Sequence, residues 1–339
     1  MPSPSRDQAL FLGVDGGGSK TCFVLLASSG EVVATHEAGG AYYLQIGLDG
    51  LRERLKTGLT QTLAKAGVAV DQITHAFFGL PAHGEDSRIT ATLDALPGEV
   101  LGHGRHSCGN DMICGWAGSL AGVDGVSITA GTGSIGYGER QGRTARVGGW
   151  GEVFGDEGSA YWIALGGLNL FSRMSDGRLP RGPLHAILTE VFHLTSDLDL
   201  STRIIADYAP ERDLIAALSR HVAEAAQAGD AQAIGLFERA AAELALLASS
   251  LRTQLGFADD EVVRVSYSGG VFRAGDIILR PFARALADCG MRFELVRPQM
   301  GPGVGAAVYA AKMAGAPLSQ QAVERLRLSS AIEDTHDQI

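Results

Sequence analysis

The sequence predicts an α/β protein that consists of two related lobes. Two segments, 10–36 and 126–147, share one order of elements: strand, glycine-rich turn, strand, turn, strand. Such a repeat, at a spacing near one domain length, indicates an internal duplication. The chain has 339 residues, enough for two domains. Segments rich in Ala and Leu between later strands predict helices that cover the sheets.

Hydrophobic patterns define the elements in chain order. Short apolar runs bounded by glycine or polar turns predict strands, and apolar residues spaced by three and four predict helices. The expected strands are 10–14, 22–27, 31–36, 73–80, 100–102, 126–129, 135–139, 143–147, 262–266 and 292–296. The expected helices are 48–66, 86–96, 112–121, 214–228, 231–255, 277–289 and 306–314.

Composition excludes several classes of protein. The formal net charge is −10 and Lys and Arg form no cluster, which argues against nucleic acid or an anionic membrane as the main partner. No apolar run approaches the ~20 residues of a membrane span, and the N-terminus lacks a signal-peptide pattern. These features predict a cytoplasmic small-molecule enzyme.

The four cysteines are scattered and form no CxxC pair, which is typical of reduced thiols. They are Cys22, Cys108, Cys114 and Cys289. His103, His106 and Cys108 are close in sequence, but no carboxylate lies at a suitable spacing, so a metal site is disfavoured.

The first glycine-rich turn offers groups that bind phosphate. Gly17, Gly18, Ser19 and Lys20 bring backbone N–H groups, a hydroxyl and a cation together. A Walker A loop is excluded because Ser19 separates Gly18 from Lys20. A dinucleotide fingerprint is excluded because Cys22 replaces the last glycine and a strand follows. The turn therefore resembles a phosphate-binding hairpin.

Asp15 ends the strand before this turn. A carboxylate beside phosphates is a typical ligand of hydrated Mg²⁺. An aspartate that initiates a turn is an equally common explanation. The residue alone leaves both open.

The second glycine-rich turn spans Gly131–Gly133 and contains Thr132. The segment Gly148–Trp162 follows it, with five glycines around the pair Asp156–Glu157. Dense glycines permit positive φ and close approach of a ligand. We interpret the turn as a phosphate site and the loop as a site for a hydroxylated substrate. The alternative is a surface loop with solvated acids.

Asp111 opens the helix expected at 112–121. It fits an N-cap, and it also fits a catalytic base of the kind that accepts the proton of an attacking hydroxyl. We expect the helix dipole to keep it ionised. Residue type alone favours the cap. Gly269 and Gly270 similarly follow a strand, either as a ligand-facing turn or as a simple connection.

Six segments in order resemble the actin-like sugar kinase superfamily, in the branch of N-acetylglucosamine kinases and BadF/BcrA-type ATPases. They are VDGGGSKT, NDMICGWAGSL, ITAGTGSIGYG, GGWGEVFGDEGSAYWIA, YSGGVF and GPGVGAA. The resemblance implies two ribonuclease-H-like lobes with a central cleft for ATP and a sugar. The expected lobes are 1–117, joined by a C-terminal helix at 317–331, and 118–316. It also implies a homodimer.

The resemblance assigns roles residue by residue. Asp15 would hold Mg²⁺ and Asp111 would be the general base. The residues expected to bind ATP are Gly17, Gly18, Ser19, Lys20, Gly131, Thr132, Gly133, Ala216, Gly269 and Gly270. The residues expected to line the sugar site are Tyr42, Asp111, Ser134, Ile135, Gly149, Trp150, Gly151 and Asp156.

Two features depart from the family pattern. N-acetylglucosamine kinases carry a sugar-contacting asparagine shortly before an Ile-Gly pair, and Tyr42 stands at that place. The loop Leu80–His83 also lacks the smaller residues common there. The departures leave the exact sugar open.

The expected function is an ATP-dependent kinase that phosphorylates an amino sugar, N-acetylglucosamine or a related hexosamine, at the 6-hydroxyl. One alternative is an ATPase of the 2-hydroxyacyl-CoA dehydratase activator type, which needs cluster-binding cysteines. Another is a non-catalytic sugar sensor.

Overall fold

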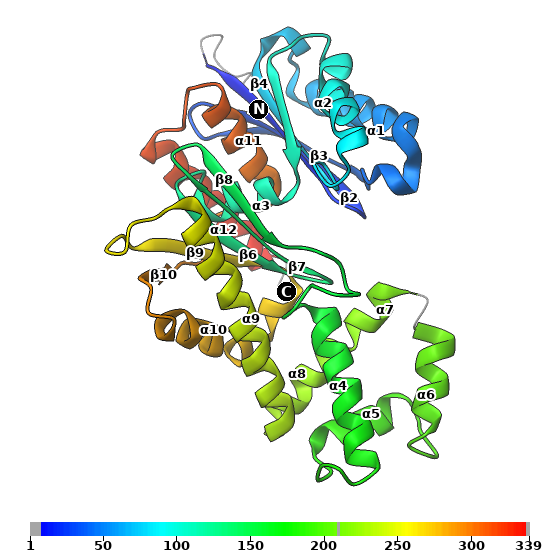
Figure 1. Cartoon of the computed structure of the whole chain (residues 1–339). Helices are drawn as coiled ribbons and strands as arrows, with labels where there is room; N and C mark the ends of the chain where they lie inside the picture. The colour runs from blue at the N-terminus through cyan, green and yellow to red at the C-terminus, as the bar shows by residue number, and fades with distance from the viewer. Residues whose placement is uncertain (1–7, 209–210, 337–339) are drawn as a thin grey trace. The chain divides into compact units, whose positions relative to one another are not determined.

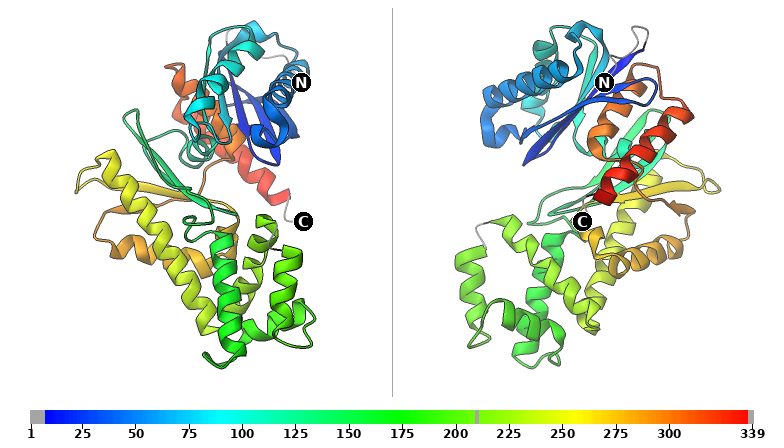
Figure 2. Two further views of the ribbon diagram at one scale, coloured as in Figure 1. Left: turned by 45° about the vertical axis from the view of Figure 1, so that its right-hand side comes forward. Right: turned by 180° about the vertical axis from the view of Figure 1, so that it is seen from behind.

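The computed structural model describes residues 8–208 and 211–336. The chain divides into two compact units, unit 1 (Met1–Val123 with Arg297–Ile339) and unit 2 (Asp124–Val296). Each unit contains one five-stranded sheet, in the order β3-β2-β1-β4-β5 in unit 1 and β8-β7-β6-β9-β10 in unit 2 (Figures 1 and 2). In both, the first three strands are antiparallel and the last two run parallel to the first. The predicted duplication into two α/β lobes of ribonuclease-H type is therefore confirmed.

Unit 1 has a sheet with helices on both faces (Figure 1). Along β2, Phe23 and Leu25 pack with the helices α1 and α2, whereas Val24 and Leu26 pack toward α11 and α12. A strand buried on both faces reads as one continuous apolar run. The elements are β1 Leu10–Gly16, β2 Lys20–Ala27, β3 Val32–Gly39, α1 Tyr43–Ala66, η1 Val70–Gln72, β4 Ile73–Leu80, α2 Ser87–Leu101, β5 His106–Asn110, α3 Met112–Leu120, α11 Pro302–Met313 and α12 Gln320–His336.

The helix α11 packs closely on β1 and α3. A Cβ on Gly13 would overlap the backbone of Ala307, and a Cβ on Gly118 would lie 2.8 Å from the carbonyl oxygen of Met300. Only glycine permits so close an approach. This packing puts residues 118–123 and 297–316 in unit 1, which differs from the lobe of 118–316 expected from the sequence.

Unit 2 combines its sheet with a group of helices, α4 to α8, that pack on one another (Figure 2). The long helix α9 crosses β6, β7 and β8, and a Cβ on Gly136 would lie 2.9 Å from Leu251 of this helix. The elements are β6 Gly125–Ala130, β7 Ser134–Arg140, β8 Arg143–Gly148, α4 Ala160–Ser175, α5 Pro183–Val191, α6 Asp199–Arg203, the π-helical η2 Ile204–Tyr208, α7 Arg212–Ala217, α8 Ser219–Gln227, α9 Ala231–Leu255, β9 Val263–Ser268, η3 Gly270–Ala274, α10 Asp276–Asp288 and β10 Phe293–Leu295.

Two expected elements differ from the structure. The expectation of a strand at 100–102 is wrong, because α2 continues through Pro97 and ends at Leu101. The strand actually lies at His106–Asn110, where the sequence is too polar to signal one. The helix expected at 214–228 is two helices, α7 and α8. Within the part of the chain that is described, no helix has the length and apolar character to cross a membrane.

Candidate active site

Three carboxylates follow the three parallel strands of unit 1. Asp15 is the last residue but one of β1, Glu85 lies in the loop after β4, and Asp111 comes directly after β5. The carboxyl ends of parallel strands meet at one edge of a sheet. In register, Asp15 pairs with Gly79 of β4, the middle one of the three parallel strands. A Cβ on Gly79 would lie 3.2 Å from the Cα of Asp111, so the segments that carry the two aspartates both contact this glycine.

The environment of Asp111 favours the neutral carboxyl. Burial raises its pKa to about 7, with further contributions from the charges of Asp15 and Glu85. The backbone amides of Met112 and Asp111 at the start of α3 lower this pKa, as expected at a helix N-terminus, but burial and the two like charges outweigh their effect. A carboxyl with a pKa near neutrality is well suited to accept a proton.

The capping role expected of Asp111 belongs to its neighbour. The amide of Met112 donates to Oδ1 of Asn110 at 3.1 Å. The Asp111 side chain makes no cap hydrogen bond of regular geometry among the described residues, although the backbone amides of Met112 and Asp111 lower the pKa of its carboxyl. The Asn110 amide nitrogen also donates to the carbonyl of His83 at 3.1 Å. Asn110 therefore fixes the start of α3 and the loop after β4.

Asp15 has the environment of a cation ligand. Burial raises its pKa to about 6, which a hydrogen bond with Cys114 and the charge of Lys20 only partly oppose. A carboxylate that is costly to ionise gains most from a nearby cation, and Mg²⁺ prefers one or two carboxylates plus phosphates and waters. The residues present therefore fit Mg²⁺.

The first glycine-rich turn joins β1 and β2. The amide of Gly17 donates to the carbonyl of Lys20 at 2.8 Å and closes the turn. Gly18, Ser19 and Lys20 are exposed at its tip. The Nζ of Lys20 pairs with Glu37 of β3 at 3.1 Å, a contact that the sequence did not predict. The turn thus presents polar groups to the outside.

Tyr42 immediately precedes α1 and is half-buried. Burial raises the pKa of its phenol, and the charge of Glu85 raises it further. The same Glu85 charge acts on Asp111. The Glu85 carboxylate therefore raises the pKa of both Tyr42 and Asp111.

The second glycine-rich turn anchors the helix α4 in unit 2. The amide of Gly131 donates to the carbonyl of Gly133, and the amide of Ala160 donates to the carbonyl of Gly131, both at 2.9 Å. The hydroxyl of Thr132 donates to Oδ1 of Asp213 at 3.0 Å. The turn is thereby tied to α4 and to α7.

In the loop after β8, Asp156 is held in place by burial and by a contact with Arg212. It is buried, with 4% of its surface exposed, and has φ of +59°. Nη2 of Arg212 donates to its Oδ2, and Nε of Arg212 lies 3.2 Å from Glu152. A solvated surface acid is therefore the wrong interpretation of Asp156, although Glu157 is exposed.

The remaining loop residues differ in exposure. The hydroxyl of Ser134 donates to the carbonyl of Glu157 at 2.7 Å, and the amide of Gly149 donates to the carbonyl of Ser134 at 2.9 Å. A Cβ on Gly149 would lie 2.7 Å from Ile135. The side chains of Trp150 and Phe154 are more than two-thirds exposed. The loop therefore has a fixed base and an open apolar tip.

A cavity of about 310 Å³ lies beside the turn after β9. Gly269 has φ of +97°, and a Cβ there would lie 2.9 Å from the amide of Gly131, so this turn packs against the second glycine-rich turn. Residues of α8, α9 and η3 line the cavity: Arg220, Ala223, Gln227, Phe237, Gly270 and Arg273. Ala216 of α7 is buried in the core instead. The helix expected at 214–228 thus contributes its second part, α8, to the lining of this cavity.

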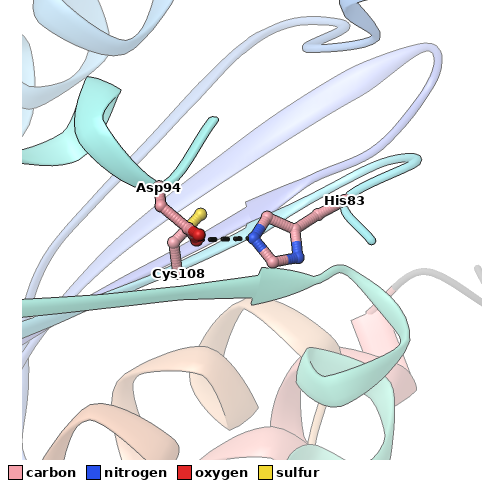
Figure 3. A group of neighbouring side chains, drawn as sticks. All are labelled: His83, Asp94 and Cys108. Carbon is pink, nitrogen blue, oxygen red and sulfur yellow. Dashed lines mark hydrogen bonds and ion pairs between the residues drawn. The ribbon is translucent and has the colours of Figure 1, made fainter. Parts of the chain in front are cut away.

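The structure brings Cys108 together with His83 and Asp94 (Figure 3). Among the described residues these three have donor atoms close enough to share a metal ion, whereas the sequence had grouped Cys108 with His103 and His106. The carboxylate of this group comes from α2, which is not near Cys108 in sequence.

Sequence reasoning missed two residues with charged side chains near the expected site residues. Glu85 could have been found, because an acid in the loop after a strand that neighbours β1 lies at the same sheet edge. Arg212 could not, because it is 56 residues from Asp156 and no local pattern marks it.

A model of the BadF/BadG/BcrA/BcrD ATPase family matches residues 12–310. The chain belongs to this family. It is 28% identical to an N-acetyl-D-glucosamine kinase of Dictyostelium discoideum, over 89% of this chain and 97% of that protein. It is 26% identical to an N-acetylmuramic acid/N-acetylglucosamine kinase of Clostridium acetobutylicum, over 88% of this chain and 97% of that protein.

Solved structures agree with this membership. A Chromobacterium violaceum protein, provisionally named an N-acetylglucosamine kinase, superposes with a TM-score of 0.65 at 26% identity, over 88% of this chain and 98% of that one. A glucokinase of the ROK family from Streptomyces griseus, solved with glucose and AMPPNP, gives a TM-score of 0.52 at 18% identity, over 90% of this chain and all of that one. The similarity to this glucokinase is evidence for the fold alone.

Proposed function

We propose that this family member transfers the γ-phosphoryl group of ATP to the 6-hydroxyl of an amino sugar, N-acetylglucosamine or a related hexosamine. At the coarser level the chain is an ATP-dependent sugar kinase, as its relatives are. The observation that carries the finer proposal is the position of Asp111, directly after β5 at the sheet edge where Asp15 is the last residue but one of β1.

Asp111 is the proposed general base. Its pKa of about 7 lets it accept the proton of the attacking sugar hydroxyl near neutral pH. Asp15 is the proposed ligand of the Mg²⁺ that accompanies ATP. The ion, when bound, would neutralise charge that develops on the β- and γ-phosphates. Its charge would also oppose the burial that makes both carboxylates costly to ionise.

The two glycine-rich turns are the proposed phosphate sites. In unit 1, backbone groups of Gly17 and Gly18 with the Ser19 hydroxyl would contact phosphate oxygens. In unit 2, Gly131–Gly133 would do the same, with Thr132 held by Asp213. The cavity beside Gly270 is of a size that admits a planar base, and we assign adenosine to it.

Asp156 is the proposed anchor of the sugar in unit 2. A buried carboxylate held by an arginine has a fixed orientation and can accept hydrogen bonds from sugar hydroxyls. Backbone groups of Ser134 and Gly149–Gly151, together with Ile135 and the Trp150 ring, complete the proposed unit 2 contacts. In unit 1, the Tyr42 phenol would contact the substituent that distinguishes one amino sugar from another. The activator-type ATPase is not favoured, because the relatives are named as sugar kinases.

The experiment that tests the proposal measures ADP release with Mg-ATP against a panel of sugars. The panel contains N-acetylglucosamine, glucosamine, N-acetylmuramic acid, N-acetylmannosamine and glucose. We expect one amino sugar to stimulate ADP release strongly, with phosphorus NMR of the product showing a 6-phosphate. Sugar-independent ATP turnover, or sugar binding without turnover, would overturn the proposal. Tyr42→Asn and Tyr42→Phe, compared on the same panel, test whether this residue sets the preference.

A further inference from the structure

Three side chains of different chemical types converge at one point in unit 1 (Figure 3). His83 lies in the loop after β4, Asp94 on α2, and Cys108 on β5. The Nε2 of His83 lies 2.7 Å from Oδ1 of Asp94, and the donor atoms of all three residues lie within 4.8 Å of one another. Imidazole, carboxylate and thiol are the three side-chain ligands that zinc accepts.

The separations match a tetrahedral centre after a small movement. Zinc lies about 2.0–2.3 Å from N, O and S ligands, so two ligand atoms of a tetrahedron are roughly 3.3–3.8 Å apart. The His83–Asp94 pair would open from its present hydrogen bond, and the Cys108 sulfur would move inward by up to about 1.5 Å. We propose that His83, Asp94 and Cys108 bind one Zn²⁺ ion, with water as the fourth ligand.

The surroundings of the three residues are those of a ligand site with an opening. The His83 side chain is 15% exposed and that of Asp94 is 53% exposed, so an ion and a water molecule can reach the group from the Asp94 side. The backbone of His83 is held by the hydrogen bond from Asn110, which fixes the loop that carries the imidazole. The sulfur and nitrogen donors favour zinc over Mg²⁺, which prefers oxygen.

Binding replaces protons with the metal. Burial and the charge of Asp94 raise the pKa of the Cys108 thiol to about 12, so the metal-free protein carries an S–H group there. On binding, the sulfur–zinc bond forms, the S–H bond breaks, and the proton is released to water. The Nε2 lone pair of a neutral His83 forms the second bond and an Asp94 oxygen the third.

The ion would connect the loop after β4, α2 and β5. These segments meet through a parallel strand pair and a helix that covers it. A ligand that binds only the folded protein raises its stability. The kinase proposal uses other side chains, so the zinc site can be tested independently of it.

The test is a titration of the full-length, metal-free protein with Zn²⁺ in competition with a chromogenic chelator. We expect one ion per chain. We expect Asp94→Asn and Cys108→Ser each to weaken binding by more than the about 10–100-fold that loss of an outer-shell partner costs. Cys289→Ser, which removes an exposed thiol elsewhere, should bind zinc as the native chain does. Co²⁺ should give a thiolate-to-metal charge-transfer band that Cys108→Ser abolishes.

Folding is checked separately by circular dichroism and by the melting midpoint. Asp94 is half-exposed, so Asp94→Asn keeps the test valid even if Cys108→Ser unfolds. Zinc should raise the melting midpoint of the native chain and of Cys289→Ser more than that of the two ligand variants. Zinc affinity that is equal in the native chain and in folded Asp94→Asn would overturn the proposal. So would the absence of a stoichiometric site.

Discussion

Asp15, next to the last residue of β1, and Asp111, directly after β5, belong to the two parallel strands that flank β4, and the charge of Asp15 adds to burial in raising the pKa of Asp111. We propose Asp15 as the cation ligand and Asp111 as the proton acceptor. This division of roles is the basis of the proposed phosphoryl transfer, since the base and the metal ligand must have different partners.

Asp111→Asn tests the general base. The amide keeps the shape of the side chain but cannot accept the proton, so we expect kcat to fall by about 10²–10⁴-fold. The measurement is sugar-dependent ADP release at saturating ATP. Asp49→Asn, a change of an exposed aspartate on α1, should leave kcat unchanged. An Asp111→Asn protein with native turnover would remove the residue from the mechanism.

The pH dependence of stability follows from the same group. The unfolded pKa of an aspartate is 3.8 and that of folded Asp111 is about 7, so between these values the folded state binds more protons. Its contribution to stability is thus fully present below about pH 4 and is lost as pH rises through about 7. Asp111→Asn cannot lose a proton, so without metal or nucleotide its free energy of unfolding should fall less from pH 4 to pH 8. Urea titrations at several pH values measure this; parallel curves for the two proteins would contradict the prediction.

Arg212 holds Asp156 and Glu152 together in unit 2. Arg212→Ala leaves the buried Asp156 carboxylate without this partner, so we expect the free energy of unfolding to fall by roughly 1–3 kcal/mol. Because Asp156 is the proposed sugar anchor, we also expect the sugar KM to rise about 10-fold or more while the ATP KM changes less. Arg212→Lys keeps the charge but loses the forked geometry and should be intermediate.

A surface ion pair provides the control for Arg212. Arg284 pairs with Glu238 at 2.8 Å, and both side chains are largely exposed. Arg284→Ala should change the stability by no more than about 1 kcal/mol and neither KM. If Arg212→Ala behaves like Arg284→Ala in both readouts, Arg212 does not position the loop.

The fold could be predicted where a pattern of apolar residues and turns lies within one contiguous segment. The repeated strand–turn–strand order of 10–36 and 126–147 sufficed for two related lobes, because each copy is a contiguous pattern. The strand His106–Asn110 could not be predicted, because its five residues include a histidine, a glycine and an asparagine. Its place in the sheet depends on pairing with β4, which lies far away in sequence.

The candidate site was predictable in its glycines and carboxylates but not in what they contact. The motif around Asp111 identified the residue, yet its raised pKa depends on burial and on the charges of Asp15 and Glu85, none of which is visible locally. Similarly, Asp156 was selected for its glycine-rich setting, whereas Arg212 reaches it from α7. The roles assigned to these residues remain predictions.

Substitutions of the neighbouring residues Gly269 and Gly270 distinguish an effect on folding from an effect on nucleotide binding. At Gly269, φ is +97° and a Cβ would overlap the backbone of Ala130. Gly269→Ala should therefore lower the free energy of unfolding by more than about 2 kcal/mol, through strain and overlap together. At Gly270, φ is not positive and no described atom lies within 4 Å of a Cβ position. Gly270→Ala should change the stability by less than about 0.5 kcal/mol.

Gly270→Ala then tests where the nucleotide binds. Gly270 lines the cavity beside η3, so a methyl group there takes space in which we place adenosine. We expect Gly270→Ala to raise the ATP KM several-fold while the sugar KM and the melting midpoint stay near native values. Urea unfolding and ADP-release kinetics on both variants make the comparison. An ATP KM that is unchanged in Gly270→Ala would mean that adenosine binds elsewhere, because the added methyl group meets no described protein atom that could otherwise absorb its effect.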